Sequence, residues 1–389
     1  MILLKLAYKN LIGKGLRTWL NIGVLSFIYV LIIWHQGIFS GMLRYGMREM
    51  IKDDIAGGQY WYKLYDPYDP ISIEHSHGPI PSELNSLIND NQAVPILISP
   101  ASIYPQGRLQ TILLKGIDPD QTVLDIPANK LSRVEDILPV LIGKRMAKNN
   151  SLKIGDYVTI RFRDTNGTFD AIESKIVEIM NTKVSTIDNN QFWIPLKSLQ
   201  KMTGLTNQAT IITIHQDIKE QTEISDWLFK SSDFLLKDLK FMVKTKRIGG
   251  IVMYSILMFL AMLAVFDTQV LAIFRRRKEI GTLMALGMTR FRVIMLFTLE
   301  GILNGITAVG VAAVYGIPWL LYFSKKGMKM PVTADDFGFA LAERLFPIYS
   351  AGLVLTTVLI VMCAVTIVSY IPSRKISKLN PTDSLKGKM

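Results

Sequence analysis

Four long apolar stretches divide the chain: residues 19–41, 248–274, 301–323 and 347–371. The second contains one charged residue, Asp267, and the other three contain no Lys, Arg, Asp or Glu. Each has at least 23 residues. At ~1.5 Å of rise per residue, such a helix is long enough to cross a hydrocarbon core of ~30 Å. The pattern therefore predicts four transmembrane helices.

Between the first two apolar stretches the pattern changes. Residues 42–247 alternate short strand-like runs with turn signals such as Asp118-Pro119. The predicted strands are 94–98, 109–115, 157–162, 171–179, 192–194 and 210–215. The predicted helices are 82–90, 144–149, 196–203 and 221–237. We therefore expect a mixed α+β domain of one or two lobes, inserted between transmembrane helices one and two.

The basic residues indicate which ends of the apolar stretches face the cytoplasm. Residues 1–18, 274–292 and 372–389 hold 15 Lys and Arg against two acids, Glu279 and Asp383, a net charge of +13. The rest of the chain has a net charge of −1. By the positive-inside rule these three segments and both termini are cytoplasmic, and the α+β domain is extracytoplasmic. Membrane topology thus explains the total of +12 without a nucleic-acid partner.

These observations give an α-helical membrane domain of four helices plus an extracytoplasmic α+β domain. In chain order we expect a cytoplasmic amphipathic helix, the first transmembrane helix, the α+β domain, the second transmembrane helix, a short cytoplasmic helix, the third transmembrane helix, an extracytoplasmic loop, the fourth transmembrane helix and a cytoplasmic tail. Their expected bounds are 1–18, 19–41, 42–247, 248–274, 275–292, 293–323, 324–346, 347–371 and 372–389.

Composition agrees with a membrane protein that has a large water-facing part. Apolar residues make up 49% of the 389 residues and charged residues 20%. The single cysteine, Cys363, cannot form an internal disulfide. The sequence has no phosphate-binding loop and no nucleophile elbow, and His75 and His77 are too few ligands for a metal centre. We therefore expect no catalytic residue, metal or cofactor site on this chain.

Two short cytoplasmic segments carry apolar patterns. Residues 1–18 place Leu and Ala on one face and Lys and Arg mostly elsewhere, which predicts a helix on the inner leaflet or a basic flank that orients the first span. Residues 275–292 predict a short helix that starts near Glu279 and ends near Gly287. Its apolar side chains form either an exposed ridge for a partner or a face packed on the protein's own helices. The ridge is Ile280, Leu283, Met284, Leu286 and Phe291.

The same segment resembles the ABC permeases grouped with MacB, FtsX and the lipoprotein-releasing Lol permeases. The matching motifs are Glu279-Ile280-Gly281, Ala285-Leu286-Gly287-Met288, Glu300-Gly301, Leu6–Leu20, Ile142–Asp156 and Ile371–Leu385. The resemblance covers residues 1–40, about 140–200 and 250–389. Gly301 and Gly305 also form a pair of small residues at the spacing that brings helices close together.

The resemblance implies a permease that works with a separate cytoplasmic ATPase, which binds ATP and Mg²⁺. Members of the family are dimers, and the short helix between spans two and three contacts the ATPase. They carry the ATP-driven movement across the membrane by mechanotransmission. On this chain the matching coupling residues are Glu279, Ile280, Gly281, Leu283, Met284, Ala285, Leu286 and Gly287. The chain itself is then not an enzyme.

The resemblance further favours release or export of a lipoprotein from the bacterial cytoplasmic (inner) membrane. The alternatives are MacB-like efflux of a hydrophobic small molecule or peptide, and FtsX-like regulation of a cell-wall hydrolase. Depth and apolarity select five candidate substrate contacts: Trp34, Phe39, Met42, Tyr254 and Met258. The expected partners are the ATPase, an identical or different second permease, membrane lipid, a lipoprotein substrate and a periplasmic chaperone or adaptor.

Overall fold

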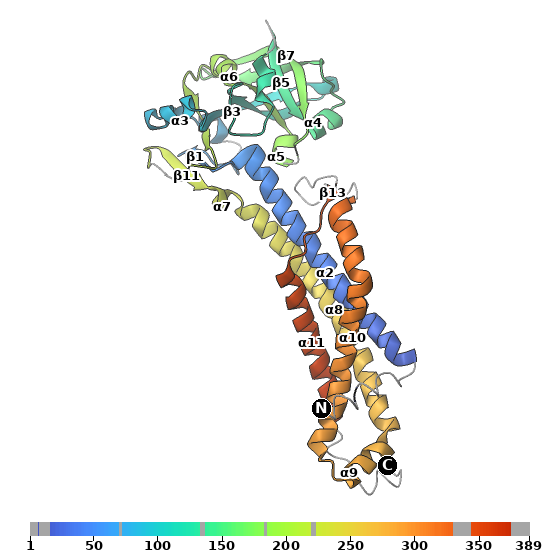
Figure 1. Ribbon diagram of the computed structural model, residues 1–389. Coiled ribbons are helices and arrows are strands. Elements are labelled where there is room, and N and C mark those ends of the chain that lie inside the picture. The colour runs from blue at the N-terminus through green and yellow to red at the C-terminus, as the bar shows by residue number, and fades with distance from the viewer. Residues whose placement is uncertain are drawn as a thin grey trace. The chain divides into compact units, whose positions relative to one another are not determined.

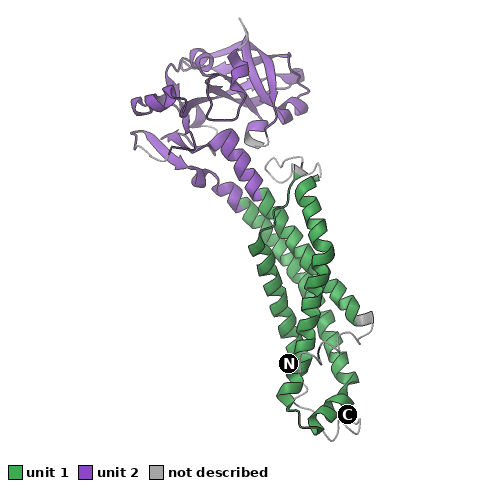
Figure 2. Ribbon diagram, in the orientation of Figure 1, with its two compact units in different colours: residues 1–42, 242–328, 345–389 green, residues 43–241, 329–344 purple. Residues whose placement is uncertain are grey.

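The computed structural model describes Ala7 and residues 16–69, 72–132, 137–182, 185–218, 223–329 and 344–374. The chain forms two compact units, drawn in green and purple in Figure 2. The helical unit comprises residues 1–42, 242–328 and 345–389, and the α/β unit comprises 43–241 and 329–344. The expected surface helix at 1–18 lies outside the described residues except for Ala7 and 16–18, and so does the tail beyond residue 374.

Four helices of the structure are long and apolar enough to cross a membrane. They are α2 (Leu16–Met50), α8 (Lys237–Arg275), α10 (Arg290–Lys326) and α11 (Ala351–Ser373), seen in Figure 1. The first three have 35, 39 and 37 residues, which makes them roughly 52 to 58 Å long. Each therefore extends beyond the apolar stretch that predicted it. The side of the membrane on which each end lies stays a prediction.

Small and apolar side chains hold the helical unit together. Its core includes Leu25 and Tyr29 of α2, Val265 of α8, and Val361 of α11. At Gly301 of α10 a Cβ would lie only 2.0 Å from Ser369 Oγ of α11. The predicted close approach of a helix at this glycine is therefore confirmed.

The α/β unit is built on nine hydrogen-bonded strands in the order β11-β1-β10-β3-β4-β8-β5-β7-β6, and β3 also pairs with β6. The strands are β1 (Gly58–Tyr62), β3 (Ala93–Ile103), β4 (Gln110–Ile117), β5 (Leu138–Gly143), β6 (Tyr157–Arg163), β7 (Phe169–Met180), β8 (Gln191–Pro195), β10 (Ile211–Ile214) and β11 (Trp227–Ser231). Two-residue strands form two further pairs, β2 (Gly78–Pro79) with β9 (Gln208–Ala209) and β12 (Met328–Lys329) with β13 (Arg344–Leu345).

The pairing of β3 with β6 closes six of these strands, β3-β4-β8-β5-β7-β6, into a ring. Strict alternation along β6 directs Val158, Ile160 and Phe162 into the core of this ring and leaves Tyr157 and Arg161 outside. The first half of β3 pairs instead with β10, so this strand belongs both to the ring and to the smaller sheet β11-β1-β10. The expected mixed α+β domain is thus present.

Short helices complete the α/β unit. They are α3 (Asn85–Asn89), α4 (Lys144–Asn149), α5 (Ser185–Asp188), α6 (Leu196–Thr203) and α7 (Ser232–Leu235). Single turns of 3₁₀-helix occur at Ser72–His75, Ser82–Leu84, Pro105–Gly107 and Ala128–Ser132, and a π-helical turn, Ile51–Ile55, follows α2. The predicted helices at 144–149 and 196–203 are confirmed with their bounds.

One predicted helix is wrong. Residues 221–237 were expected to be helical, but 227–231 form the edge strand β11, and helix resumes only at α7. Pairing with β1 decides the outcome, because it packs Phe229 on Tyr60 and Trp227 on Tyr62, with ring centroids 5.0 and 5.8 Å apart. Strand β5 was not predicted, since it is buried throughout and therefore shows no alternation.

Candidate functional site

The short helix between α8 and α10 is the candidate functional site. This helix, α9, has nine residues, Arg277–Ala285. Two hydrogen bonds close its end: Gly287 N–H donates to Met284 O at 3.1 Å, and Met288 N–H donates to Leu283 O at 3.0 Å. Gly287 has a φ of +93°, a conformation that favours glycine. The motif is therefore a helix C-cap of the Schellman type, and its sequence pattern placed Gly287 correctly.

One face of α9 packs on the helices beside it. Ile280 is only 1% exposed and lies in a cluster with Ile273, Val293, Ile294 and Phe297. Ile280 was expected on an exposed ridge and is instead buried, because the start of α10 lies against it. Gly281 is also buried, and Leu283 and Met284 are half-buried.

The opposite face of α9 and the turn after it are exposed. Leu286 is 80% exposed and Phe291 71% exposed, so these two side chains are what remains of the expected apolar ridge. Glu279, Ala285 and Gly287 are exposed as well. Of the eight predicted coupling residues, four are accessible and four are partly or wholly packed inside this chain.

Arg276 anchors α9 through two carboxylates. Its Nη1 lies 2.9 Å from Glu300 Oε1 on α10, and its Nε lies 2.6 Å from Glu279 Oε2 on α9. The guanidinium carbon also lies 5.1 Å from the centre of the Phe297 ring. Although burial alone lowers the pKa of Arg276, the Glu300 and Glu279 carboxylates outweigh it and raise that pKa. Sequence reasoning missed Arg276; the signal was an acid, Glu300, directly before an apolar stretch.

Polar side chains continue from Glu300 into the helical unit. Gln269 of α8, Asn304 of α10 and Ser369 of α11 are all buried. A Cβ at Gly301 would lie 3.1 Å from Gln269 Nε2 as well as 2.0 Å from Ser369 Oγ. The glycine therefore lets side chains from α8 and α11 meet against α10, one residue after Glu300.

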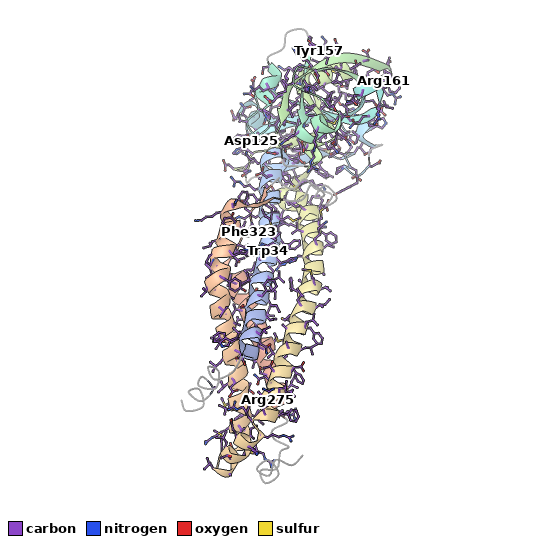
Figure 3. All side chains as sticks on the ribbon, turned by 90° about the vertical axis from the view of Figure 1, so that its right-hand side faces the viewer. Trp34, Asp125, Tyr157, Arg161, Arg275 and Phe323 are labelled. Atoms are coloured by element: carbon purple, nitrogen blue, oxygen red, sulfur yellow. The ribbon has the colours of Figure 1, made fainter. Side chains whose placement is uncertain are left out.

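The five candidate substrate contacts fall into separate groups. His35, which sequence reasoning did not select, brings two of them together: its ring lies 4.9 Å from Phe39 and 5.7 Å from Tyr254. Trp34 instead packs on Trp319 at 5.6 Å, as part of an aromatic group that includes Phe323. Figure 3 labels Trp34 and Phe323.

The remaining two candidates lie within the helical unit. Met258 packs half-buried against the core of the four helices, and Met42 is buried. A separate apolar groove runs between α2 and α8, where Phe27, Leu31 and Leu257 are among its lining residues. None of the five candidates lines this groove.

The π-helical turn after α2 holds three charged residues, each paired within the α/β unit. Lys52 forms an ion pair with Asp125, and Asp53 accepts a hydrogen bond from Thr182 Oγ1 at 2.7 Å. Asp54 Oδ1 lies 3.9 Å from Nζ of the buried Lys115. Such turns interrupt the regular helix and are frequent at functional sites.

Lys115 is buried, as Asp53 is. Its ammonium group lies 4.8 Å from the centre of the Trp193 ring. Burial lowers the pKa of Lys115, and the Asp54 carboxylate only partly opposes this effect.

The histidines considered as metal ligands lie in the α/β unit, where His77 Nδ1 contacts Gln208 Oε1 at 2.6 Å. The described residues contain no group of three or more His, Cys, Asp or Glu that could hold a metal ion.

Comparison with known proteins gives a match in the region that contains α9. Residues 251–381 match the family described as FtsX-like permease C-terminal. The chain is also 23% identical over 185 residues to the macrolide export ATP-binding/permease protein MacB of Sodalis glossinidius. That alignment covers 47% of this chain and 26% of the relative, so the chain spans about a quarter of the length of the relative.

Solved structures were also found to be similar. One of them is the extracellular domain of the noncanonic ABC-type transporter YknZ from Gram-positive bacteria, which is 14% identical, with a TM-score of 0.25. The alignment covers 43% of this chain and 84% of that domain.

Proposed function

We infer that this chain, a member of the MacB/FtsX-type ABC permeases, is the permease subunit of an ATP-driven transporter whose ATPase is a separate cytoplasmic protein. The observation that carries this proposal is the form of α9. The helix is fixed by Ile280 and Arg276, while Leu286 at its end and Phe291 at the start of α10 are exposed.

The physical argument starts from those two exposed side chains. Exposed apolar groups of this size are costly in water and mark a contact surface when they occur together. The same segment of the chain carries exposed basic residues, Lys278, Arg290 and Arg292. A partner with an apolar groove and an acidic rim therefore fits this surface. We propose that the ATPase supplies that groove and binds ATP and Mg²⁺, so that this chain is not itself an enzyme.

The finer proposal concerns the membrane and the cargo. We propose a bacterial inner-membrane protein with both ends of α9 in the cytoplasm and the α/β unit outside. Two permeases, identical or different, would work as a dimer and move the α/β units by mechanotransmission. Lipoprotein release is the cargo reaction that we favour, because a lipid-anchored protein needs to be lifted from the membrane into water rather than passed through a pore. A periplasmic chaperone or adaptor would then receive the lipoprotein.

A second candidate function draws on the similarity to a macrolide export protein. In that case the same movement expels a hydrophobic small molecule or peptide. A third, regulation of a cell-wall hydrolase, needs the same helices and the same ATPase. These three differ only in what binds the α/β unit and the helices, so they are separated by the molecules that purify with the chain.

The proposal is tested by purifying the full chain from its native membrane in mild detergent. Wild-type protein should retain an ATPase, identified by mass spectrometry and by ATP hydrolysis. Leu286→Asp and Phe291→Asp should each lower the retained ATPase at least tenfold, since a buried carboxylate opposes docking. Leu109→Asp, which alters an exposed leucine of the α/β unit, is the matched control. Equal retention by all four proteins would contradict the proposal.

The same purification distinguishes the candidate cargoes. An acylated protein bound in stoichiometric amount supports lipoprotein release. A bound hydrophobic small molecule or peptide supports efflux, and a cell-wall hydrolase supports regulation.

A further inference from the structure

We propose that Arg276 is a positioning residue that links α9 to the buried Glu300, so that a displacement of α9 moves α10 and α11. This inference rests on the proposed function, because it takes α9 as the element that the ATPase moves. It adds the path by which that movement enters the helical unit.

The link is short and uses one rigid group. Arg276 is the residue between α8 and α9, Glu279 belongs to the first turn of α9, and Glu300 belongs to α10. A single planar guanidinium donates to both carboxylates, at 2.6 Å and 2.9 Å. Because the donors of arginine are fixed relative to one another, a change in the position of one carboxylate is felt at the other.

The two bonds differ in strength because their carboxylates differ in burial. Glu300 is 0% exposed, and a buried carboxylate depends strongly on its cation. Glu279 is largely exposed, so water weakens its ion pair with Arg276. A protein that docks on α9 can therefore compete for Glu279 while the bond to Glu300 holds. A change at the exposed Glu279 then shifts Arg276 and, through it, the buried Glu300.

From Glu300 the contact continues through close packing. The next residue, Gly301, lies against Ser369 of α11 and Gln269 of α8, with no room for a methyl group. Asn304, one turn further along α10, is buried on the same face as Glu300. Tightly packed groups transmit displacement because they cannot be compressed. A shift of the α10 turn that contains Glu300 therefore displaces α11.

The alternative hypothesis is that Arg276 stabilises the buried Glu300 and transmits no movement. The two hypotheses differ in the response of α11 to ATP. The chain offers a probe for it, since its only cysteine, Cys363, is exposed on α11. A nitroxide attached there gives a spectrum whose line shape changes with the surroundings of this helix.

The experiment uses the full chain with its ATPase in lipid nanodiscs, labelled at Cys363, with and without ATP. Arg276→Gln tests the link. The double variant Arg276→Gln/Glu300→Gln removes both charges and keeps a polar pair, so it is expected to fold even if the single variant does not. Arg275→Gln is the matched control, because it removes the adjacent guanidinium at the exposed end of α8.

We expect wild type and Arg275→Gln to show the same ATP-dependent change in line shape. Arg276→Gln and the double variant should retain the ATPase and the ATP-free spectrum, and should lose at least four-fifths of that change. A full response in the double variant would overturn the inference, as would an absent response in wild type with ATPase bound. Loss of ATPase from the double variant would overturn it too, because Arg276 would then serve docking. If wild type binds no ATPase, the proposed function itself fails, and the inference fails with it.

Discussion

Two buried ion pairs, one in each unit, solve the burial of charge in different ways. In the helical unit, Arg276 and Glu300 are in direct contact, and the carboxylate is fully buried. In the α/β unit, Lys115 is the buried partner, and its nearest carboxylate, Asp54, lies 3.9 Å away. The first arrangement is a directional hydrogen-bonded pair. The second is a loose ion pair supplemented by an aromatic ring, Trp193.

The difference determines how the cation of each pair responds to pH. Arginine keeps its charge at every pH that proteins tolerate, so the cation of the Arg276 link does not titrate. Lysine can lose its proton, and burial lowers the pKa of Lys115 although the Asp54 carboxylate opposes this effect. Of these two pairs, the one whose cation can lose its proton is therefore the Lys115 pair of the α/β unit.

The largest effect is expected from removing one member of the helical pair. Arg276→Leu leaves the Glu300 carboxylate buried without its guanidinium, which should destabilise the helical unit by ~3–5 kcal/mol. Replacing both residues by leucine should recover most of that loss, since the buried carboxylate is gone. Denaturation of the detergent-solubilised chain measures both. A single variant as stable as the double one would show that the pair is not coupled.

A smaller effect is expected where the polar cluster meets α11. Gly301→Ala inserts a methyl group in contact with Ser369 and should cost ~1–3 kcal/mol through overpacking. Ser369→Gly in the same chain should restore much of the stability by making room. Gly310→Ala is the control on the same helix, because nothing lies within 4 Å of its Cβ. The thermal midpoint should fall for Gly301→Ala and stay level or rise for Gly310→Ala.

The smallest effect is expected from the loose pair. Because the pKa of Lys115 is lowered on folding, the unfolded chain binds more protons between that lowered pKa and the ordinary value of 10.5. Stability therefore rises with pH across this window, as the unfavourable buried charge is released. Lys115→Met should lack this rise and be at least as stable as wild type at neutral pH. Unfolding of wild type and of Lys115→Met, measured at several pH values from 7 to about 10.5, checks this prediction. An equal change of stability with pH in the two proteins would contradict it.

Local patterns in the sequence were enough to predict the parts of the fold that form locally. The four apolar stretches lie within α2, α8, α10 and, but for its first four residues, α11, and the alternation of 157–162 indicates a strand with one buried face. The closed ring depends on β3 meeting β6, strands separated by more than fifty residues, and nothing local encodes that pairing. The edge strand β11 was mistaken for helix for the same reason.

The candidate site shows the same division. The pattern around Gly287 gave the end of α9, because a helix cap is a local structure. The burial of Ile280 could not be predicted, since it depends on Val293 and Phe297 lying back against α9. Arg276 was one of four consecutive basic residues, and only the fold shows which of them reaches Glu300.

The central claim is that a separate ATPase docks on Leu286, which caps α9, and on Phe291, at the start of α10. It is tested most directly by photocrosslinking. A photoreactive amino acid is placed singly at 286, 291 or the buried position 280 of the full chain in its native membrane. The account predicts covalent products with the ATPase from positions 286 and 291, and from 280 only products within this chain. Products with the ATPase from none of the three, or equally from all three, would contradict it.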